Sequence, residues 1–409
     1  MRILHVVHGY PPNIGGTQRL IAELSEGLVA RYGDEVTVFT TTALSNYHFW
    51  QQDRRALESG TEHINGVTVQ RFPVFNRFSG WRLRVARLAY RWRLPGNDWA
   101  RALYNGPLVP GLKRAIATQA ADVVVAASFP LLHMHTAQRG AEAASRPLIF
   151  IGGLHSEDVW GFDRPMIYRA IRRADRYIAY TDFERDRLVD RGIPDRQIEV
   201  IGGAIDATSF RTAEPGRWRR AMGWSDDPVI AFVGQQGPHK GIDTLLASMP
   251  ALWELEPRAC LAIAGQPTAF SAALQAQRQR LPAIARQRIR FLDAPVRREI
   301  IDLIAACDVL ALPSRHESFG LVLLEAWLAG KPIVAARIGA LESVVQDGVD
   351  GLLATPGDPT DWSRALIALL TDAELRREMG SAGQRKVLER HTWDVVLPRF
   401  RAVYGECVR

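Results

Sequence analysis

The sequence predicts an α/β protein of two domains, each a doubly wound parallel sheet, that face each other across a cleft. The prediction rests on the length of the chain and on the alternation of short apolar runs with helical periodicity. With 409 residues, 47% of them hydrophobic, the chain is too long for one ordinary core. Two domains of roughly 200 residues each are therefore expected.

The first half of the chain alternates apolar runs with amphipathic stretches. Residues 17–31 have large apolar side chains at helical spacing, at Leu20, Ile21, Leu24 and Leu28. The apolar runs expected as strands are ILHVV, VTVFTT, VTVQRFPV, DVVVAAS and PLIFIGG. Runs this apolar, separated by helical stretches, are typical of parallel sheets that are covered on both faces.

The same pattern restarts after Asp226, with expected strands VIAFVG, ACLAIAG, RIRFLD, DVLALPS, KPIVAA and GLLAT. We therefore expect an N-terminal domain over residues 1–205 and a C-terminal domain over residues 206–392. A last helix, at about residues 393–409, is expected to pack back on the first domain. In open parallel sheets, ligands bind beyond the carboxyl ends of the strands.

Composition narrows the class of protein. The three cysteines, Cys260, Cys307 and Cys407, are odd in number and far apart, which fits a reducing compartment and neither a disulfide framework nor a metal site. The N-terminal apolar stretch is too short for a signal peptide, and no run is long enough to span a bilayer. A cytoplasmic protein is expected.

Two glycine-rich loops are candidate phosphate sites. In HGYPPNIGG, Gly15 and Gly16 let a ligand approach the backbone and leave free amides at the start of a helix. The loop lacks the G-x-G-x-x-G pattern, so a nicotinamide site is poorly supported. In FVGQQGPHKG, Lys240 stands between an expected strand and an expected helix. A point charge at this place suits a diphosphate, so this role is favoured over that of an ordinary surface lysine.

The strongest signal is DVLALPSRHESFGLVLLEAWLAGKPIVA. Ser318 is expected to begin a helix, with Glu317 just before it and Glu325 two turns into it, so that both carboxylates lie on roughly one side. The amides of Phe319, Gly320 and Leu321 would then point out of the helix N-terminus. Amides for phosphates and carboxylates for hydroxyls together suit a sugar diphosphate. Solvated glutamates are the alternative, disfavoured for Glu325 by its apolar neighbours.

ESFGLVLLE resembles the pair of glutamates, separated by seven residues, of the retaining family-four glycosyltransferases, which have the GT-B fold of two Rossmann-like domains. Further segments are similar in the same order: PPNIGG, ADRYIAYTDFERDRL, IEVIGGAIDATSF, FVGQQGPHKGIDTLL and GALESVVQDGVDGLL. The resemblance spans most of residues 1–395. It implies transfer of a sugar from a nucleotide-sugar, taken as a UDP- or GDP-sugar, to a sugar, glycan or lipid-linked acceptor, with no other cofactor.

The resemblance also implies roles for individual residues. Glu317 would bind hydroxyls of the transferred sugar, Glu325 would bind the ribose, and His155 in GGLHSEDVW would face the donor sugar. The catalytic candidates are thus His155 and Glu317. The donor-binding candidates are Gly15, Gly16, Gln235, Lys240, Phe319, Gly320, Leu321 and Glu325.

Two positions depart from the family pattern. Gln235 stands where the family has an arginine, and a neutral amide cannot neutralise a leaving diphosphate. Some charge must then come from elsewhere, or turnover is slower. Asp293 stands where the family has a glycine near the nucleotide base, so the base is not assigned. The chain contains no Asp-x-Asp tripeptide, which predicts a metal-independent mechanism in which cations and helix dipoles stabilise the departing diphosphate.

Residues 76–101 carry seven arginines and one aspartate, against a net charge of +7 for the whole chain. Helical spacing predicts an apolar stripe of Trp81, Val85, Leu88 and Trp92. Arginines flank it on one side (Arg84, Arg87, Arg91) and on the other (Arg82, Arg93). The segment fits a peripheral contact with the anionic inner face of a membrane, and it fits equally a helix packed over an acceptor cleft. No recognised nucleic-acid module accompanies it, so nucleic acid is not an expected partner.

Two other functions stay open from the sequence. One is another enzyme of the same fold, a sugar-nucleotide epimerase or a phosphorylase, although neither a pyridoxal lysine in suitable context nor an inorganic phosphate site is evident. The other is a weakly active, nucleotide-binding module of the membrane surface, which Gln235 and the arginine-rich segment suggest.

Overall fold

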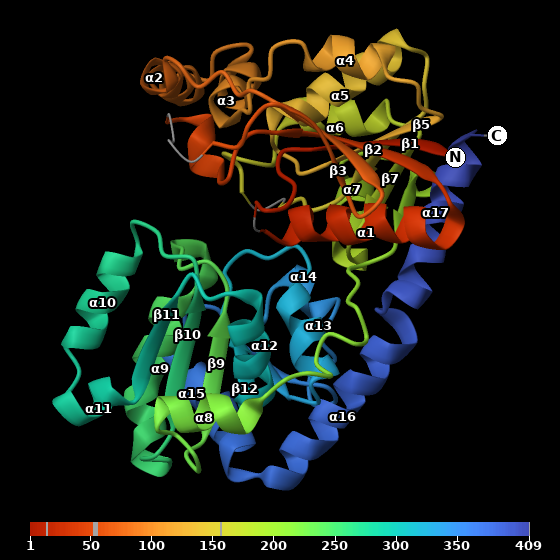
Figure 1. The fold of residues 1–409 in the computed structure, drawn as a ribbon. Coiled ribbons are helices and arrows are strands. Elements are labelled where there is room, and N and C mark those ends of the chain that lie inside the picture. Colours follow the sequence, from red (N-terminus) through yellow and green to blue (C-terminus); the bar gives the residue numbers. More distant parts are fainter. Residues whose placement is uncertain (14, 52–55, 156–157, 409) are drawn as a thin grey trace. The chain divides into compact units, whose positions relative to one another are not determined.

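The computed structural model describes residues 1–13, 15–51, 56–155 and 158–408, which form two compact units (Figure 1). Unit 1 comprises Met1–Gly203 and Val396–Arg409, and unit 2 comprises Ala204–Val395. Each unit contains a parallel or largely parallel sheet with helices packed on it, so the predicted α/β class with two such sheets is confirmed. Among the described residues, no helix is long and apolar enough to cross a membrane.

Unit 1 is built on an eight-stranded sheet in the order β3-β4-β2-β1-β5-β6-β7-β8. Its strands are β1 (Arg2–Val7), β2 (Glu35–Thr41), β3 (Gly60–Ile64), β4 (Val67–Phe72), β5 (Val123–Ala127), β6 (Leu148–Ile151), β7 (Arg176–Ala179) and β8 (Ile198–Val200). Neighbouring strands are parallel except β3 and β4. The central strand β1 pairs with β2 through Ile3 and Val36 and with β5 through Ile3 and Val123, all of them buried.

The antiparallel edge strand β3 was not predicted. It joins β4 through Asn65 and Gly66, which both have positive φ, at 50° and 84°. Such a two-residue turn matches the twist of a hairpin and favours Asn-Gly. Because β3 is almost entirely exposed, it lacks the apolar run from which the other strands were predicted.

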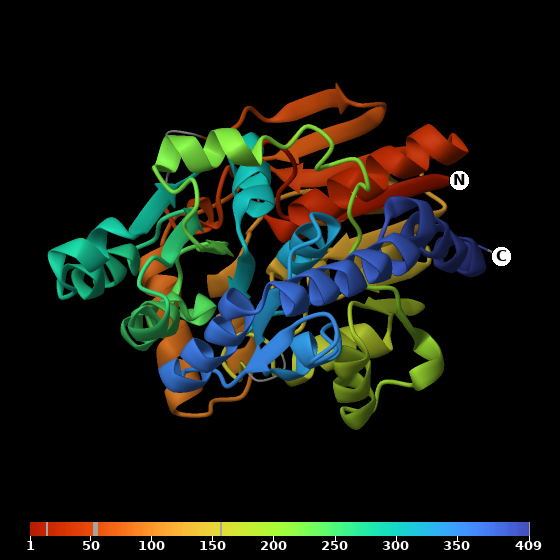
Figure 2. The same cartoon turned by 90° about the horizontal axis from the view of Figure 1, so that it is seen from below.

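The helices of unit 1 are α1 (Gly16–Tyr32), α2 (Ser79–Arg91), α3 (Asn97–Asn105), α4 (Leu112–Thr118), α5 (Leu132–Ala143), α6 (Pro165–Arg172) and α7 (Asp182–Asp190). They are joined by most of α17 (Trp393–Val408). The hydroxyl of Tyr404 on α17 lies 3.2 Å from Nε2 of His5, and Nε of Arg401 donates to Asp34 at 2.9 Å. Both views place α17 beside the amino terminus of β1 (Figures 1 and 2).

Unit 2 contains a six-stranded, fully parallel sheet in the order β11-β10-β9-β12-β13-β14. Its strands are β9 (Val229–Val233), β10 (Cys260–Gly265), β11 (Ile289–Asp293), β12 (Val309–Leu312), β13 (Ile333–Ala336) and β14 (Leu352–Ala354). The order reverses between β9 and β12, and a sheet of this kind binds ligands at that switch point, beyond the carboxyl ends of the strands.

Nine helices of unit 2 follow or connect these strands within the described residues. They are α8 (Pro215–Met222), α9 (Ile242–Leu255), α10 (Ser271–Gln279), α11 (Ala283–Gln287), α12 (Arg297–Ala306), α13 (Leu321–Leu328), α14 (Gly339–Glu342), α15 (Pro359–Thr371) and α16 (Ala373–Arg390). Gly241, the residue before α9, packs its backbone against Pro313, the residue that follows β12. A Cβ at this position would lie 1.9 Å from the carbonyl oxygen of Pro313, so only glycine lets the two loops approach this closely.

Candidate active site

The carboxyl ends of β9 and β12 bring Lys240 and Glu317 together. Lys240 ends a short 3-10 helix (Pro238–Lys240) after β9, and Glu317 lies in the loop after β12. Nζ of Lys240 donates to Oε2 of Glu317 at 2.6 Å, and both side chains are largely shielded from solvent. Two residues that are far apart in the sequence thus form one ion pair at the switch point of the sheet.

Arg315 fixes the two loops that carry this pair. Its guanidinium forms a bidentate ion pair with Asp243 on α9, at 2.9 and 2.8 Å, and donates to the carbonyl oxygen of Pro238 at 2.7 Å. Hydrogen bonding to Asp243 raises the pKa of Arg315. Planar, bidentate pairs of this kind constrain geometry more than a single contact does. The sequence analysis did not single out Arg315, because nothing in the local pattern reveals a partner 72 residues away.

Glu325 has a different cationic partner. Its side chain is buried in the apolar helix α13, and its Oε1 forms an ion pair with Nη1 of Arg297, 2.6 Å away. Arg297 is the first residue of α12, directly after the loop that follows β11. A buried carboxylate needs such a partner, because an uncompensated charge in an apolar setting is costly. The sequence analysis identified Glu325 and missed Arg297.

The predicted start of the helix after Glu317 is wrong. Gly320 adopts a left-handed conformation (φ 83°), so α13 begins at Leu321, and Ser318 and Phe319 belong to the preceding loop. Leu321 alone of the three proposed residues supplies an amide from the first turn of the helix. Glu325 lies about one turn into α13 rather than two. The helical argument that put the two glutamates on one side does not apply, since Glu317 is outside the helix.

Gln235 and Asp293, the two residues that differ from the family pattern, have different surroundings. The side chain of Gln235 is exposed, whereas its neighbour Gln236 is buried. Nε2 of Gln236 donates to Oδ1 of Asp293 at 2.8 Å and to the carbonyl oxygen of Gly265 at 3.2 Å. Gln236 therefore fixes the carboxylate of Asp293 at the end of β11.

Three of the predicted site residues belong to unit 1. Gly15 precedes α1 and Gly16 is its first residue, and no described side chain caps this helix end. His155 follows β6, and its ring lies edge-on to that of Phe162, with 4.7 Å between the ring centroids. The roles of Gly15, Gly16 and His155 stay predictions.

The arginine-rich segment forms α2 and α3. The stripe predicted on α2 is exposed, with Trp81 at 66% and Trp92 at 68% of full exposure. The prediction that Arg82 lies on a flank of this stripe is wrong, because its side chain is buried beneath the helix. Its guanidinium donates to the carbonyl oxygens of Leu103 at 2.9 Å and Phe49 at 3.3 Å, and burial lowers its pKa.

The other six arginines of residues 76–101 are likewise either buried or exposed. Arg101 is buried and forms an ion pair of 2.6 Å with Asp98. The exposed ones are Arg77, Arg84, Arg87, Arg91 and Arg93. The outer surface of α2 therefore combines large apolar side chains with three cations, and Arg77 and Arg93 add one more just beyond each end of the helix.

The sheet orders and the pattern of parallel strands are those of the GT-B fold. The sucrose-phosphate synthase of Thermosynechococcus elongatus has a similar structure, with a TM-score of 0.75 and 18% identity over 99% of each chain. HepE of Anabaena, in complex with UDP-glucose, gives a TM-score of 0.72 with 19% identity over 99% of this chain and 100% of HepE. At this level of identity the likeness concerns the fold.

Sequence comparison identifies the family. The model of "Glycosyltransferase Family 4" matches residues 14–209, and that of "Glycosyl transferases group 1" matches residues 216–386. The chain belongs to the family-four, or group 1, glycosyltransferases. It is 34% identical to the D-inositol 3-phosphate glycosyltransferase of Stackebrandtia nassauensis over 251 residues, which are 59% of this chain and 56% of that protein. The match thus spans a little over half the length of this curated relative.

Proposed function

We propose that this protein transfers a sugar from a UDP- or GDP-sugar to an acceptor hydroxyl, with retention of configuration and without a metal ion. The observation that carries the proposal is the ion pair of Lys240 and Glu317 at the carboxyl ends of β9 and β12. A cation there suits a diphosphate, and a carboxylate beside it suits the hydroxyls of the attached sugar. Family membership and the glutamate of α13 support the same assignment.

In this proposal each group has one task. Lys240, with the amide of Leu321 at the start of α13, stabilises the negative charge that develops as the diphosphate leaves. Glu317 accepts hydrogen bonds from the sugar, and Glu325 from the ribose. The bond from the anomeric carbon to the diphosphate breaks while the bond to the acceptor oxygen forms on the same face, and the proton of the acceptor hydroxyl passes to the departing diphosphate. Since position 235 carries no cation, Lys240 bears a larger share of this charge.

The acceptor is proposed only by its chemistry. Two curated relatives carry the name D-inositol 3-phosphate glycosyltransferase, and the matches cover 56% and 52% of their lengths. We propose a sugar, a glycan or a lipid-linked hydroxyl compound as the acceptor.

Transfer is expected to continue at an undiminished rate in excess EDTA, because the sequence contains no Asp-x-Asp tripeptide to hold a metal-bound diphosphate. The measurement is the release of nucleoside diphosphate from each donor, with and without EDTA. A known metal-dependent glycosyltransferase assayed in parallel controls for effective chelation. Loss of activity in EDTA that Mg²⁺ or Mn²⁺ restores would contradict the metal-free mechanism.

We also propose that the outer surface of α2 binds an anionic membrane, which would bring the protein to a lipid-linked or membrane-presented acceptor. The exposed Trp81 and Trp92 suit the headgroup region, where the amphipathic rings of tryptophan are enriched. Each arginine near an anionic surface contributes about 1 kcal/mol, and salt screens this attraction. The exposed stripe favours this interpretation over a stripe packed against the protein.

Replacing Arg84, Arg87 and Arg91 together with glutamate should abolish binding to vesicles that contain phosphatidylglycerol. Wild-type protein should co-sediment with these vesicles at low salt, release as salt rises, and ignore vesicles of phosphatidylcholine alone. The control changes Arg169, Arg172 and Arg173 to glutamate, three exposed arginines at α6 with the same total charge change. Equal loss in both triple variants, or no binding by the wild type, would refute a specific membrane surface on α2.

A further inference from the structure

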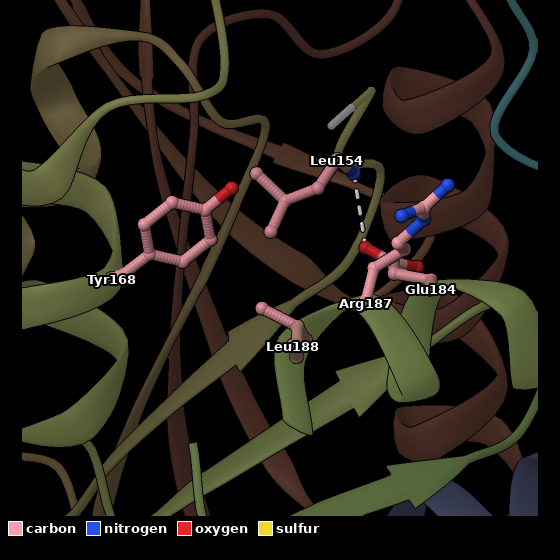
Figure 3. A pocket seen from close by; sticks show the side chains of 5 residues that line it. All are labelled: Leu154, Tyr168, Glu184, Arg187 and Leu188. Carbon is pink, nitrogen blue, oxygen red and sulfur yellow. Dashed lines mark hydrogen bonds between the residues drawn. The ribbon is translucent and has the colours of Figure 1, made fainter. Parts of the chain in front are cut away.

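A buried carboxylate holds the loop that carries His155. After β6 ends at Ile151, the chain turns through Gly152, Gly153 and Leu154. The amides of Gly153 and Leu154 both donate to Oε1 of Glu184, each at 2.9 Å. Figure 3 shows the contact between Leu154 and Glu184, which comes from α7. The residue before His155 is thus tied to a helix 30 residues further along the chain.

Glu184 is itself fixed on all sides. It is 4% exposed, and its oxygens accept two further hydrogen bonds, from the hydroxyl of Tyr177 at 2.7 Å and from the amide of Tyr180 at 2.8 Å. The hydroxyl of Thr181 caps α7 by accepting from the amide of Glu184 at 3.1 Å. Burial raises the pKa of Glu184, while these hydrogen bonds act in the opposite direction. All four partners of the carboxylate are donors, so the site requires a group that only accepts.

The loop lies directly on this carboxylate. A Cβ at Gly152 would stand 2.6 and 2.8 Å from the two oxygens of Glu184 and 2.9 Å from the carbonyl oxygen of Ile178. Gly153 has φ 113°, a conformation that side-chain-bearing residues rarely adopt. The two glycines therefore let the loop contact Glu184 and turn towards His155.

The small pocket at this point gives no alternative role. It is lined by Leu154, Tyr168, Glu184, Arg187 and Leu188 (Figure 3). Its volume is about 10 Å³, which is room for roughly one water molecule. A sugar or nucleotide does not fit there, so the four hydrogen bonds within the protein define what Glu184 does.

We infer that Glu184 is a positioning residue for sugar transfer, acting by fixing the loop that sets the place of His155. The inference rests on the proposed function, which gives His155 its role at the donor sugar. Displacing a positioned group by about 1 Å can lower the rate of reaction by roughly 100-fold. The groups proposed to bind the nucleotide, Lys240 and Glu325, belong to unit 2, whereas Glu184 and His155 belong to unit 1.

The central test is Glu184→Gln, which keeps the size of the side chain and turns one of its two acceptor oxygens into an NH2 donor. This donor then faces either the amide of Tyr180 or the amides of Gly153 and Leu154. We expect kcat to fall by about 10- to 100-fold. The dissociation constant for the nucleoside diphosphate should stay unchanged. Gly152→Ala places a methyl group against the same carboxylate and pushes the loop away from it. It should likewise lower kcat and leave the affinity for the nucleoside diphosphate unchanged.

Thr181→Ala is the matched control. It removes the cap of α7 and so destabilises the same helix, but it leaves the carboxylate and its contacts with the loop in place. The melting temperature should fall while kcat stays at the wild-type value. If Thr181→Ala lowers kcat as much as Glu184→Gln does, the effect is one of general stability and the inference is wrong.

His155→Ala separates this inference from the proposed function. Wild-type turnover in His155→Ala would remove the role of His155 and, with it, the basis of the inference. A large loss in His155→Ala beside normal kcat in folded Glu184→Gln and Gly152→Ala would overturn the positioning role alone. If Glu184→Gln does not fold, the test rests on Gly152→Ala, for which the inference again requires a lower kcat and an unchanged affinity for the nucleoside diphosphate.

Discussion

Lys240→Ala is expected to lower kcat/KM for sugar transfer by about 100- to 1,000-fold, the usual cost of removing one group that stabilises developing negative charge. Two effects add here. The departing diphosphate loses its cation, which Gln235 cannot replace, and the largely buried carboxylate of Glu317 loses the ammonium group that lies 2.6 Å from it.

The measurement is steady-state turnover together with the affinity for the nucleoside diphosphate. Lys331→Ala is the control. Lys331 precedes β13, so it lies near the amino ends of the strands, whereas Lys240 lies near their carboxyl ends. The control makes the same change in charge and should leave turnover unaffected. Adding Glu317→Gln to Lys240→Ala should cost less than the two separate losses combined, since the residues act as a pair. Wild-type turnover in Lys240→Ala would contradict the role of the ion pair.

Glu325→Ala is expected to weaken nucleotide binding by about 1.5–3 kcal/mol, or roughly 10- to 150-fold, the cost of losing hydrogen bonds to a charged group. The buried position of Glu325 on α13 motivates this prediction. Arg297 is partly exposed and can rehydrate when its partner is removed, so the variant should still fold. Calorimetric titration with UDP and GDP measures the effect.

Arg297→Ala distinguishes a ligand-binding carboxylate from a merely structural one. It breaks the same ion pair and leaves Glu325 in place to bind the ribose. Affinity should therefore fall less than in Glu325→Ala. Equal losses in the two variants, or unchanged affinity in folded Glu325→Ala, would remove the proposed contact with the ribose.

Periodicity and local motifs predicted most of the fold because each buried strand carries its own signal. VIAFVG, ACLAIAG and DVLALPS are apolar over their whole length, and the structure makes each of them a central strand. The strand β3 lacks that signal because it is exposed, although Asn65 and Gly66 mark its turn. The start of α13 was misplaced because the left-handed conformation of Gly320, which precedes the first helical residue, has no signal in the sequence beyond the glycine itself.

Contacts between distant residues were beyond sequence reasoning. Lys240 and Glu317 could each be selected from its own loop, but their ion pair depends on the order of β9 and β12. Arg297 and Glu184 belong to helices with several charged residues, and only the folded chain shows which charge turns inward. For the same reason, the buried Arg82 could not be told apart from the exposed arginines of α2.

The most direct test of the central claim follows a labelled sugar from UDP- and GDP-hexoses in the presence of candidate acceptors. The account predicts that the label moves to an acceptor and that one nucleoside diphosphate is released for each sugar transferred, with wild-type protein and not with Lys240→Ala. Interconversion of the nucleotide-sugar without transfer would instead indicate an epimerase. Release of a sugar 1-phosphate that requires inorganic phosphate would indicate a phosphorylase. Binding of the nucleotide-sugar without any turnover would leave only a nucleotide-binding module, and each of these three results would contradict the proposed glycosyl transfer.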